Sequence, residues 1–135
     1  MTKTDINEAL QAAVKKGDLA TVKQCLQAGA KDPMALNFSS ERGHLPIVQH
    51  LLGRGVSQAE KNEALWYAAS TGCLPVVECL VNDGADFRAK GSQTIIVAAE
   101  EDHLEVTQFL VERGADLEIV EEYGEEQVQQ WLGII

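Results

Sequence analysis

Apolar residues recur along this chain in four segments that have the spacing of amphipathic helices. Each segment starts at a leucine, and apolar residues follow mostly two, three, six and seven positions later, which places them on one side of a helix. A glycine stands ten positions after each leucine, and glycine in the left-handed conformation commonly ends a helix. The sequence therefore predicts four short helices, which start at Leu19, Leu45, Leu74 and Leu104 and stop at Gly29, Gly55, Gly84 and Gly114.

The four segments align with one another without a gap. They read GDLATVKQCLQAGA (17–30), GHLPIVQHLLGRGV (43–56), GCLPVVECLVNDGA (72–85) and DHLEVTQFLVERGA (102–115). Successive copies are 26, 29 and 30 residues apart. Pro46 and Pro75 directly follow a leucine and suit the first turn of a helix, because the amide hydrogen there has no partner to lose. We interpret each copy as the second helix of a repeated helix pair.

The first helix of each pair is expected just before these copies. The segments are NEALQAAVKKG, PMALNFSSERG, EALWYAASTG and TIIVAAEED. Helix N-termini are commonly capped by Asn, Asp and Ser, and we expect the caps to be Asn7, Asp32, Asn62 and Ser92. Small residues recur in pairs within these helices and allow close packing between neighbours. The pairs are Ala13 with Val14, Ser39 with Ser40, Ala68 with Ala69, and Ala98 with Ala99.

After the fourth copy, Val128, Trp131 and Leu132 have the spacing of one more amphipathic helix. We expect a C-terminal capping helix whose core contains Trp131. Its polar outer face would come from Glu121, Glu122, Glu125 and Glu126. The chain is then a single domain, 1–135, with repeats at approximately 4–31, 32–59, 60–88 and 89–118 and a cap at 119–135.

The repeated segments resemble the ankyrin repeat family, whose second half usually reads like GHLEVVKLLLEAGAD. The nearest copy is DHLEVTQFLVERGAD (102–116), and the resemblance covers roughly residues 6–117. The first helices depart from the family's TPLHLAA, since they read EALQAAV, MALNFSS, EALWYAA and QTIIVAA. Connections such as 31–33 are also too short for the family's β-hairpin finger. The resemblance therefore implies an all-α, ankyrin-like solenoid of stacked helix-turn-helix repeats with shortened or absent β-hairpin fingers.

Charge is distributed very unevenly along the chain. Residues 1–99 contain ten acidic and ten basic residues, whereas residues 100–135 contain eleven acidic residues and one basic residue, Arg113. The whole net charge of −10 therefore lies in the last segment, and a chain with this balance repels a phosphate backbone. We expect no nucleic-acid partner. The acidic segment either maintains solubility or attracts a partner with a basic surface.

Neither a membrane span nor a secretion signal is evident in the sequence. No window approaches the roughly 18 apolar residues of a membrane helix, and the start MTKTDINEALQAAVKK lacks the apolar run of a signal peptide. Cys25, Cys73 and Cys79 are odd in number and lack CxxC spacing. We expect a cytoplasmic protein with buried, reduced thiols and no membrane partner.

Candidate chemical groups do not form a catalytic or metal-binding set in the sequence. His44, Cys73 and His103 share one column of the alignment, but equivalent residues of stacked helices lie about 10 Å apart, which is too far for one metal ion. Ser39 and Ser40 stand where other copies have small residues, and no base or phosphate-binding glycine loop accompanies them. We expect no enzyme activity, no metal and no cofactor.

The family resemblance also indicates where a partner would bind. In ankyrin-like folds the two residues before the mid-repeat glycine lie on the concave side. Here they are Lys15 and Lys16, Glu41 and Arg42, Ser70 and Thr71, and Glu100 and Glu101. Their charge runs from positive through neutral to negative along the stack. The alternative is that these are merely solvated helix ends.

Trp66 occupies a column that Gln11, Asn37 and Ile96 fill in the other copies. A site that tolerates Gln and Asn does not require so large a residue. Trp66 is therefore a candidate anchor for a partner, and the alternative is a ring packed between repeats.

The leading hypothesis is a non-catalytic protein–protein interaction module or adaptor that binds a partner protein on its concave helical face. One alternative is a regulatory or inhibitory subunit that masks a partner's site. Another is an enzyme or metal-dependent protein with an unrecognised site. Because both ends of the stack carry polar residues, we expect the isolated chain to be a monomer.

Overall fold

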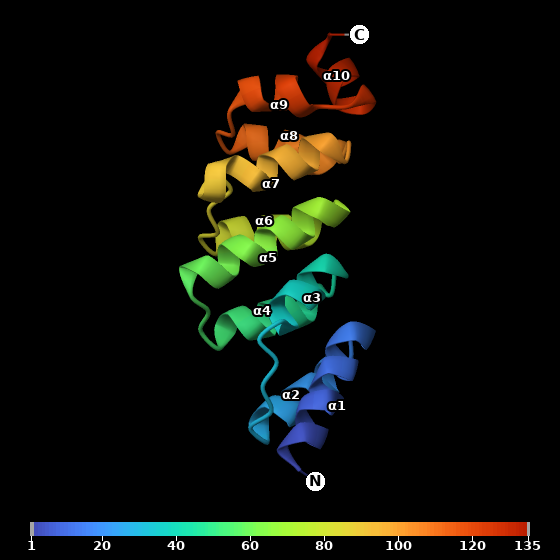
Figure 1. Ribbon diagram of the computed structural model, residues 1–135, viewed down its shortest axis with the longest axis vertical. Coiled ribbons are helices and arrows are strands. Elements are labelled where there is room, and N and C mark those ends of the chain that lie inside the picture. Colours follow the sequence, from blue (N-terminus) through green and yellow to red (C-terminus); the bar gives the residue numbers. More distant parts are fainter. Residues whose placement is uncertain (1, 135) are drawn as a thin grey trace.

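The computed structural model describes residues 2–134, which form ten α-helices in five helix-turn-helix pairs (Figure 1). The pairs are α1 (Lys3–Lys16) with α2 (Leu19–Gln27), α3 (Ala35–Glu41) with α4 (Leu45–Gly53), α5 (Gln58–Thr71) with α6 (Leu74–Asn82), α7 (Ala89–Glu100) with α8 (Leu104–Glu112), and α9 (Leu117–Tyr123) with α10 (Glu126–Leu132). No strand occurs within residues 2–134. The predicted all-α solenoid is confirmed.

The pairs are stacked so that each contacts mainly the pair before it and the pair after it. Odd-numbered helices pack on odd-numbered helices and form one layer, while even-numbered helices form the other. In Figure 1 the odd layer lies in front of the even layer, most clearly from α5 to α8. We call these the odd-helix layer and the even-helix layer.

The predicted helix ends in the even-helix layer are confirmed. Gly29, Gly55, Gly84 and Gly114 have φ values of 90°, 95°, 99° and 100°. An L-residue with a side chain rarely adopts this conformation, so glycine is needed at these helix ends. Pro46 and Pro75 lie in the first turns of α4 and α6, as predicted.

The predicted caps Asn7 and Asn62 are wrong, because both residues lie inside helices. Helices α1 and α5 each have 14 residues and begin earlier, capped by Thr2 and Ser57. The two asparagines instead tie each long helix to the loop that follows its pair. Asn7 Oδ1 accepts the backbone N–H of Lys31 at 2.8 Å, and Asn62 Oδ1 accepts that of Asp86 at 2.7 Å.

Asp32 and Ser92 do not cap helices either. The carboxylate of Asp32 accepts the backbone N–H of Met34 at 3.0 Å within the loop, and α3 begins only at Ala35. Ser92 lies inside the span of α7 with a φ of 65°, in a left-handed turn. In both places loop geometry, rather than residue type alone, determines where the helix starts.

The core lies between the two layers. The predicted small pairs of α1, α3, α5 and α7 are all buried, which lets consecutive helices of the odd-helix layer pack closely. In the even-helix layer the columns of Val22 and Val76 are almost entirely buried, whereas the columns of Leu19 and Leu26 are half-buried. The columns of Leu19 and Leu26 therefore form the edge of the core.

The C-terminal segment differs from the prediction, because it forms a fifth helix pair rather than one capping helix. Helix α9 packs on α7 and α10 packs on α8, so this pair continues both layers. Trp131 is 38% exposed and does not form a core, which corrects the prediction for this residue. Val120, Gly124 and Val128 are the buried residues of this pair. A Cβ on Gly124 would lie 2.5 Å from Val128 Cγ1, so the turn between the helices has no room for a side chain.

Candidate functional site

A hollow of about 400 Å³ lies between α5 and α7 in the odd-helix layer. Four of its lining residues, Ala59, Glu63, Lys90 and Gln93, are exposed, so the hollow is open to solvent. The other lining residues are Asn62, Trp66, Tyr67, Ala89 and Thr94. We call this hollow the α5–α7 pocket.

Two aromatic rings form one wall of the α5–α7 pocket. The centroids of the Trp66 and Tyr67 rings are 5.2 Å apart and their planes are perpendicular. Such edge-to-face pairs contribute about 0.5–1.5 kcal/mol beyond the burial of their surface. Because both side chains are half-buried, each ring restricts the movement of the other while part of its surface stays accessible.

The pocket also contains one acidic and one basic side chain. Glu63 Oε1 accepts a hydrogen bond from Asn37 Nδ2 of α3 at 3.0 Å, which fixes the carboxylate beside Trp66. Lys90 is exposed, and among the described residues the one ion pair joins Lys61 to Asp83. The ammonium group of Lys90 therefore remains available to an incoming ligand.

Lys90 belongs to a left-handed turn that interrupts α7. Lys90, Gly91 and Ser92 have φ values of 51°, 68° and 65°. Residues with a side chain occupy this region at a cost of about 1–2 kcal/mol each. The turn places Lys90 and Gln93 at the pocket, and strain of this kind is concentrated at binding sites in proteins.

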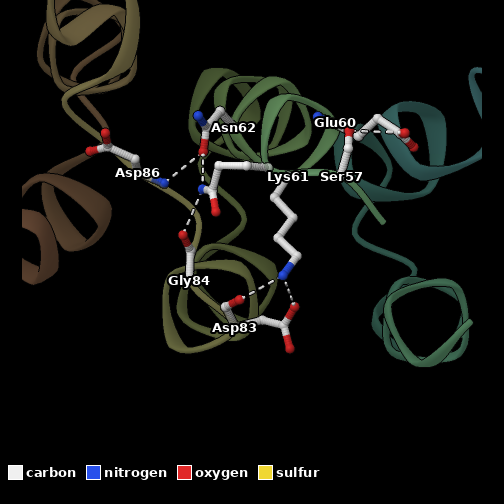
Figure 2. A network of polar contacts seen from close by, with 8 residues as sticks. Ser57, Glu60, Lys61, Asn62, Asp83, Gly84 and Asp86 are labelled. Atoms are coloured by element: carbon white, nitrogen blue, oxygen red, sulfur yellow. Dashed lines mark hydrogen bonds and ion pairs between the residues drawn. The ribbon is translucent and has the colours of Figure 1, made fainter. Parts of the chain in front are cut away.

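Polar contacts hold the loop that precedes this turn against α5 (Figure 2). Lys61 Nζ contacts the carbonyl and the carboxylate of Asp83, both at 3.0 Å. Gln58 Nε2 donates to the carbonyl of Gly84 at 2.8 Å. Together with the bond from Asp86 to Asn62, these contacts fix the α5 wall of the pocket relative to the chain that enters α7.

Eight of the nine predicted partner-binding residues lie outside the pocket. They are Lys15 and Lys16, Glu41 and Arg42, Ser70 and Thr71, and Glu100 and Glu101, at the C-terminal ends of α1, α3, α5 and α7. Glu41 and Ser70 are half-buried and the other six are exposed. Only Trp66 lines the pocket.

Some of these eight residues already have partners within the chain. The ammonium of Lys15 lies 5.6 Å from the centroid of the Phe38 ring. The hydroxyl groups of Ser70 and Thr71 donate back to backbone carbonyls of their own helix, at 2.7 Å and 3.3 Å for the shorter bonds.

The histidines in the turns join neighbouring pairs. His44 Nε2 lies 3.1 Å from the carbonyl oxygen of Lys15, and His103 Nε2 lies 3.0 Å from that of Ser70. Since a carbonyl only accepts, each imidazole donates its Nε2–H. Cys73 occupies the same column and lies against Gly43, where an added Cβ would be 3.0 Å from its sulfur. The three residues of this column thus serve contacts between pairs, and no metal-binding cluster of His, Cys, Asp or Glu is found in residues 2–134.

The cysteines are free but not all buried. Cys25 is buried, whereas Cys73 and Cys79 are half-buried, so the prediction of buried thiols is wrong for these two. Partial burial, together with the nearby carboxylate of Asp83, raises the pKa of Cys79. This thiol is therefore poorly suited to act as a nucleophile at neutral pH.

Sequence reasoning did not identify Glu63, Tyr67, Lys90 or Gln93 as pocket residues. One signal was available in the repeat alignment. The third copy has two large aromatic residues, Trp66 and Tyr67, where the first copy has Gln11 and Ala12. The left-handed turn that positions Lys90 left no comparable signal, because only Gly91 indicates it.

Known proteins resemble this chain over most of its length. A family model described as three copies of the ankyrin repeat matches residues 36–121. An ankyrin repeat and KH domain-containing protein of Caenorhabditis briggsae is 33% identical over an alignment of 117 positions that covers 80% of this chain. The ankyrin repeat and KH domain-containing protein mask-1 of Caenorhabditis elegans is 30% identical over an alignment of 116 positions that also covers 80% of this chain. The match spans only 4% of the length of either relative.

Proposed function

Because this chain belongs to the ankyrin repeat family, whose repeats generally serve as protein–protein interaction modules, we propose that it binds a partner protein on its odd-helix layer and performs no chemistry itself. The α5–α7 pocket is the observation that carries this proposal. Its lining contains no histidine, cysteine or serine, and the Glu63 carboxylate accepts a hydrogen bond from Asn37 rather than from a nucleophile.

The pocket suits a large apolar side chain of the partner. Trp66 and Tyr67 offer ring surface that is half-buried and already oriented. Tryptophan and tyrosine are enriched among the residues that contribute most to binding energy in protein interfaces. Glu63 and Lys90 stand beside the rings and can pair with polar groups that flank the inserted side chain.

The pocket walls are fixed before a partner arrives. Glu63 is bonded to α3, and Asn62, Gln58 and Lys61 are bonded to the loop after α6. Little conformational entropy is then lost when the partner binds, and this raises affinity for a given contact area.

The predicted helix-end residues form the outer part of the proposed binding surface. Their charge runs from Lys15 and Lys16 on α1 to Glu100 and Glu101 on α7, so an extended partner segment would be oriented along the stack. Residues 100–135 carry the whole net charge, which favours a basic surface on the part of the partner nearest α7 and α9.

The same site is compatible with a regulatory or inhibitory role, in which the pocket covers a functional side chain of the partner. We propose that the chain binds its partner in the cytoplasm. None of the described helices is long and apolar enough to cross a bilayer. We further propose that residues 1–135 act as one domain, with repeats at approximately 4–31, 32–59, 60–88 and 89–118 and a terminal segment at 119–135.

A random peptide library displayed on phage tests the proposal. We expect peptides selected on the wild-type chain to share a large apolar or aromatic residue and to bind Trp66→Ala at least about tenfold more weakly, as is typical of a central interface aromatic. Trp131→Ala is the matched control and should bind as wild type. Circular dichroism shows whether both variants are folded. Failure to select any peptide, or equal binding to both variants, would contradict the proposal.

A further inference from the structure

Thr94 is a buried polar residue in a column of the repeat alignment that is otherwise apolar. The first three copies have alanine at this position, namely Ala9, Ala35 and Ala64. Thr94 is 4% exposed, and it lines the α5–α7 pocket. Burying a hydroxyl group without a hydrogen-bond partner is unfavourable. The hydroxyl of Thr94 therefore needs a partner, either within the chain or outside it.

No residue within 2–134 forms a hydrogen bond with the Thr94 hydroxyl. In a regular helix a threonine hydroxyl can bond to the carbonyl three or four residues before it. Thr107 does so, because its hydroxyl donates to the carbonyl of His103 at 2.8 Å. The corresponding carbonyls for Thr94 are those of Lys90 and Gly91, which belong to the left-handed turn. The turn thus leaves the Thr94 hydroxyl without its usual acceptor.

The Thr94 hydroxyl is open to the pocket. Within residues 2–134 the fully enclosed side-chain oxygens without a partner are Asp32 Oδ2 and Ser40 Oγ. The Thr94 hydroxyl also lacks a partner but is not enclosed in this way, so solvent reaches it from the pocket that Thr94 lines. A polar group of a bound partner can reach it by the same route.

Three hydrogen-bond donors lie on the α7 wall of the pocket. They are the ammonium of Lys90, the amide of Gln93 and the hydroxyl of Thr94. None of these side chains bonds to another residue in the part of the chain that the structure describes. An anion with acceptor oxygens can satisfy all three donors. The single charge of a carboxylate matches the one cation of the lining, whereas a phosphate group carries nearly two charges.

The acidic residue of the pocket lies on a different wall. Glu63 belongs to α5, and its Oε1 accepts a hydrogen bond from Asn37 Nδ2 of α3. Asn37 is 6% exposed, so a buried amide holds the Glu63 carboxylate on the side of α5 that faces α3. A carboxylate of the partner is repelled on that side and attracted to Lys90 on the side of α7. The two walls therefore define where a negative charge binds.

We propose that the α5–α7 pocket recognises an acidic residue beside the apolar side chain of the partner, and that Lys90 and Thr94 bind the carboxylate of this Asp or Glu. The inference rests on the proposed function, because it adds a second contact to the same partner segment. An extended chain advances about 3.3 Å per residue, so the acidic residue should stand about one or two residues from the side chain that contacts Trp66.

The two contacts have different roles. The ring surface of Trp66 and Tyr67 accepts apolar side chains in general, whereas the donors of the α7 wall discriminate between partner segments. Glu100 and Glu101 lie at the opposite end of α7 from Lys90. The basic surface that we propose for the partner therefore lies away from its acidic residue.

The peptides selected on the wild-type chain provide the first test. We expect Asp or Glu to be enriched one or two residues from the shared apolar or aromatic residue. Selection on the double variant Lys90→Met, Thr94→Val should keep the apolar residue and lose the acidic one. If the wild-type peptides depend on Trp66 but show no enrichment of acidic residues, this inference is wrong while the proposed function stands.

A selected peptide with an amidated C-terminus tests the contact itself by fluorescence polarisation. Changing its Asp to Asn, or its Glu to Gln, should weaken binding to wild type about tenfold, as expected for a charged hydrogen bond. The same change should alter binding to Lys90→Met, Thr94→Val by less than about twofold, because the carboxylate has no partner left to lose. Equal weakening on both proteins would overturn the inference. So would a peptide that binds only with a free C-terminus, since the chain end would then supply the carboxylate.

Thr94→Val and Thr107→Val form a matched pair of hydroxyl deletions. Both residues are buried, but only the Thr107 hydroxyl bonds within the chain. Thr94→Val should weaken the peptide about threefold or more, the range of one hydrogen bond, without lowering the urea midpoint of the free chain. Thr107→Val should leave peptide binding unchanged. Unchanged binding to Thr94→Val, or a lower urea midpoint for this variant, would show that the hydroxyl does not serve the partner.

Discussion

The carboxylate of Asp102 accepts the backbone N–H of Val128 at 3.1 Å, across 26 residues of sequence. Its second oxygen accepts the N–H of Gln127, also at 3.1 Å. Asp102 has a φ of 57° and stands where the three preceding pairs have Gly17, Gly43 and Gly72. The fourth pair therefore has a strained residue at this turn, and the side chain of that residue caps α10.

We expect substitutions of Asp102 to separate strain from capping. Asp102→Gly relieves the backbone but loses the cap, and Asp102→Ala keeps the strain and also loses the cap. Loss of a helix cap costs about 0.5–2 kcal/mol. The free energy of unfolding should fall in the order wild type, Asp102→Asn, Asp102→Gly, Asp102→Ala, and Asp102→Ala should lie about 2 kcal/mol below wild type. Amide hydrogen exchange in α10 should be faster in the variants than in wild type. An Asp102→Ala variant as stable as wild type in urea unfolding would show that the cap contributes nothing.

Replacing Gly72 by Ala should destabilise the chain more than replacing Gly29. Both residues have a positive φ, but an added Cβ at Gly72 would lie 2.5 Å from the His103 ring, whereas nothing lies within 4 Å at Gly29. We expect a loss of about 1 kcal/mol for Gly29→Ala, from backbone strain alone, and about 2–3 kcal/mol for Gly72→Ala, from strain plus overpacking. Urea unfolding measures both.

The double variant Gly72→Ala, His103→Ala provides the control for this comparison. Removing the ring removes the clash, so introducing Gly72→Ala into a His103→Ala background should cost about as much as Gly29→Ala. Equal effects of Gly72→Ala in both backgrounds would exclude the imidazole as the cause.

Asn62→Ala and Asn7→Ala should lower the free energy of unfolding by similar amounts but differ in their effect on peptide binding. Each substitution leaves one loop N–H without its side-chain acceptor, and we expect about 1 kcal/mol from either. Only Asn62 lines the α5–α7 pocket, so only Asn62→Ala should weaken selected peptides. Titration calorimetry with such a peptide distinguishes them, and equal weakening by both variants would mean that global destabilisation is responsible.

Ser92→Gly should stabilise the fold. Ser92 has a φ of 65°, which glycine adopts without strain, and we expect a gain of about 0.5–1 kcal/mol. Gly91→Ala, at a φ of 68° with nothing within 4 Å of the added Cβ, is the matched reverse change and should lose a similar amount. If neither variant shifts the urea midpoint, the left-handed turn is not a fixed part of the folded chain.

His50 should make stability dependent on pH. Partial burial, with Lys23 and Arg54 nearby, lowers the pKa of His50 from its usual 6.5. The unfolded chain then binds a proton at His50 more readily than the folded chain, so stability decreases as pH falls below 6.5. The loss of melting temperature between pH 7.5 and pH 5.5 should be smaller in His50→Gln than in wild type. An identical loss in both would assign the pH dependence to other groups.

The sequence was informative wherever structure depends on local spacing. The leucine columns, Gly29 and its equivalents, and Pro46 and Pro75 all predict helices that the chain forms, because helix geometry relates residues three, four and ten positions apart. Asn7 and Asn62 were misinterpreted because their hydrogen-bond partners lie 24 residues away. Helix α10 was predicted as a capping helix, but α9 was not, so the sequence did not reveal a fifth pair.

The pocket could be predicted only in part. Trp66 is distinctive in its column, and the repeat alignment alone identified it as a candidate. The remaining lining residues come from two helices and from a turn whose left-handed conformation depends on how the loop at 83–86 is held. The eight helix-end residues were chosen from family geometry, and none of them lines the pocket.

Each helix pair contacts mainly its immediate neighbours. Folding of one pair therefore requires few contacts with residues far away in the sequence. Proteins with such local contacts fold quickly, and a stack of this kind can grow one unit at a time from any starting point. On the ribosome the first pair can pack as soon as Asn7 and Lys31 have both emerged, with later pairs added in order of synthesis. Helix α10, whose first turn is capped by Asp102 of the pair before it, can then complete its cap only after that pair has formed.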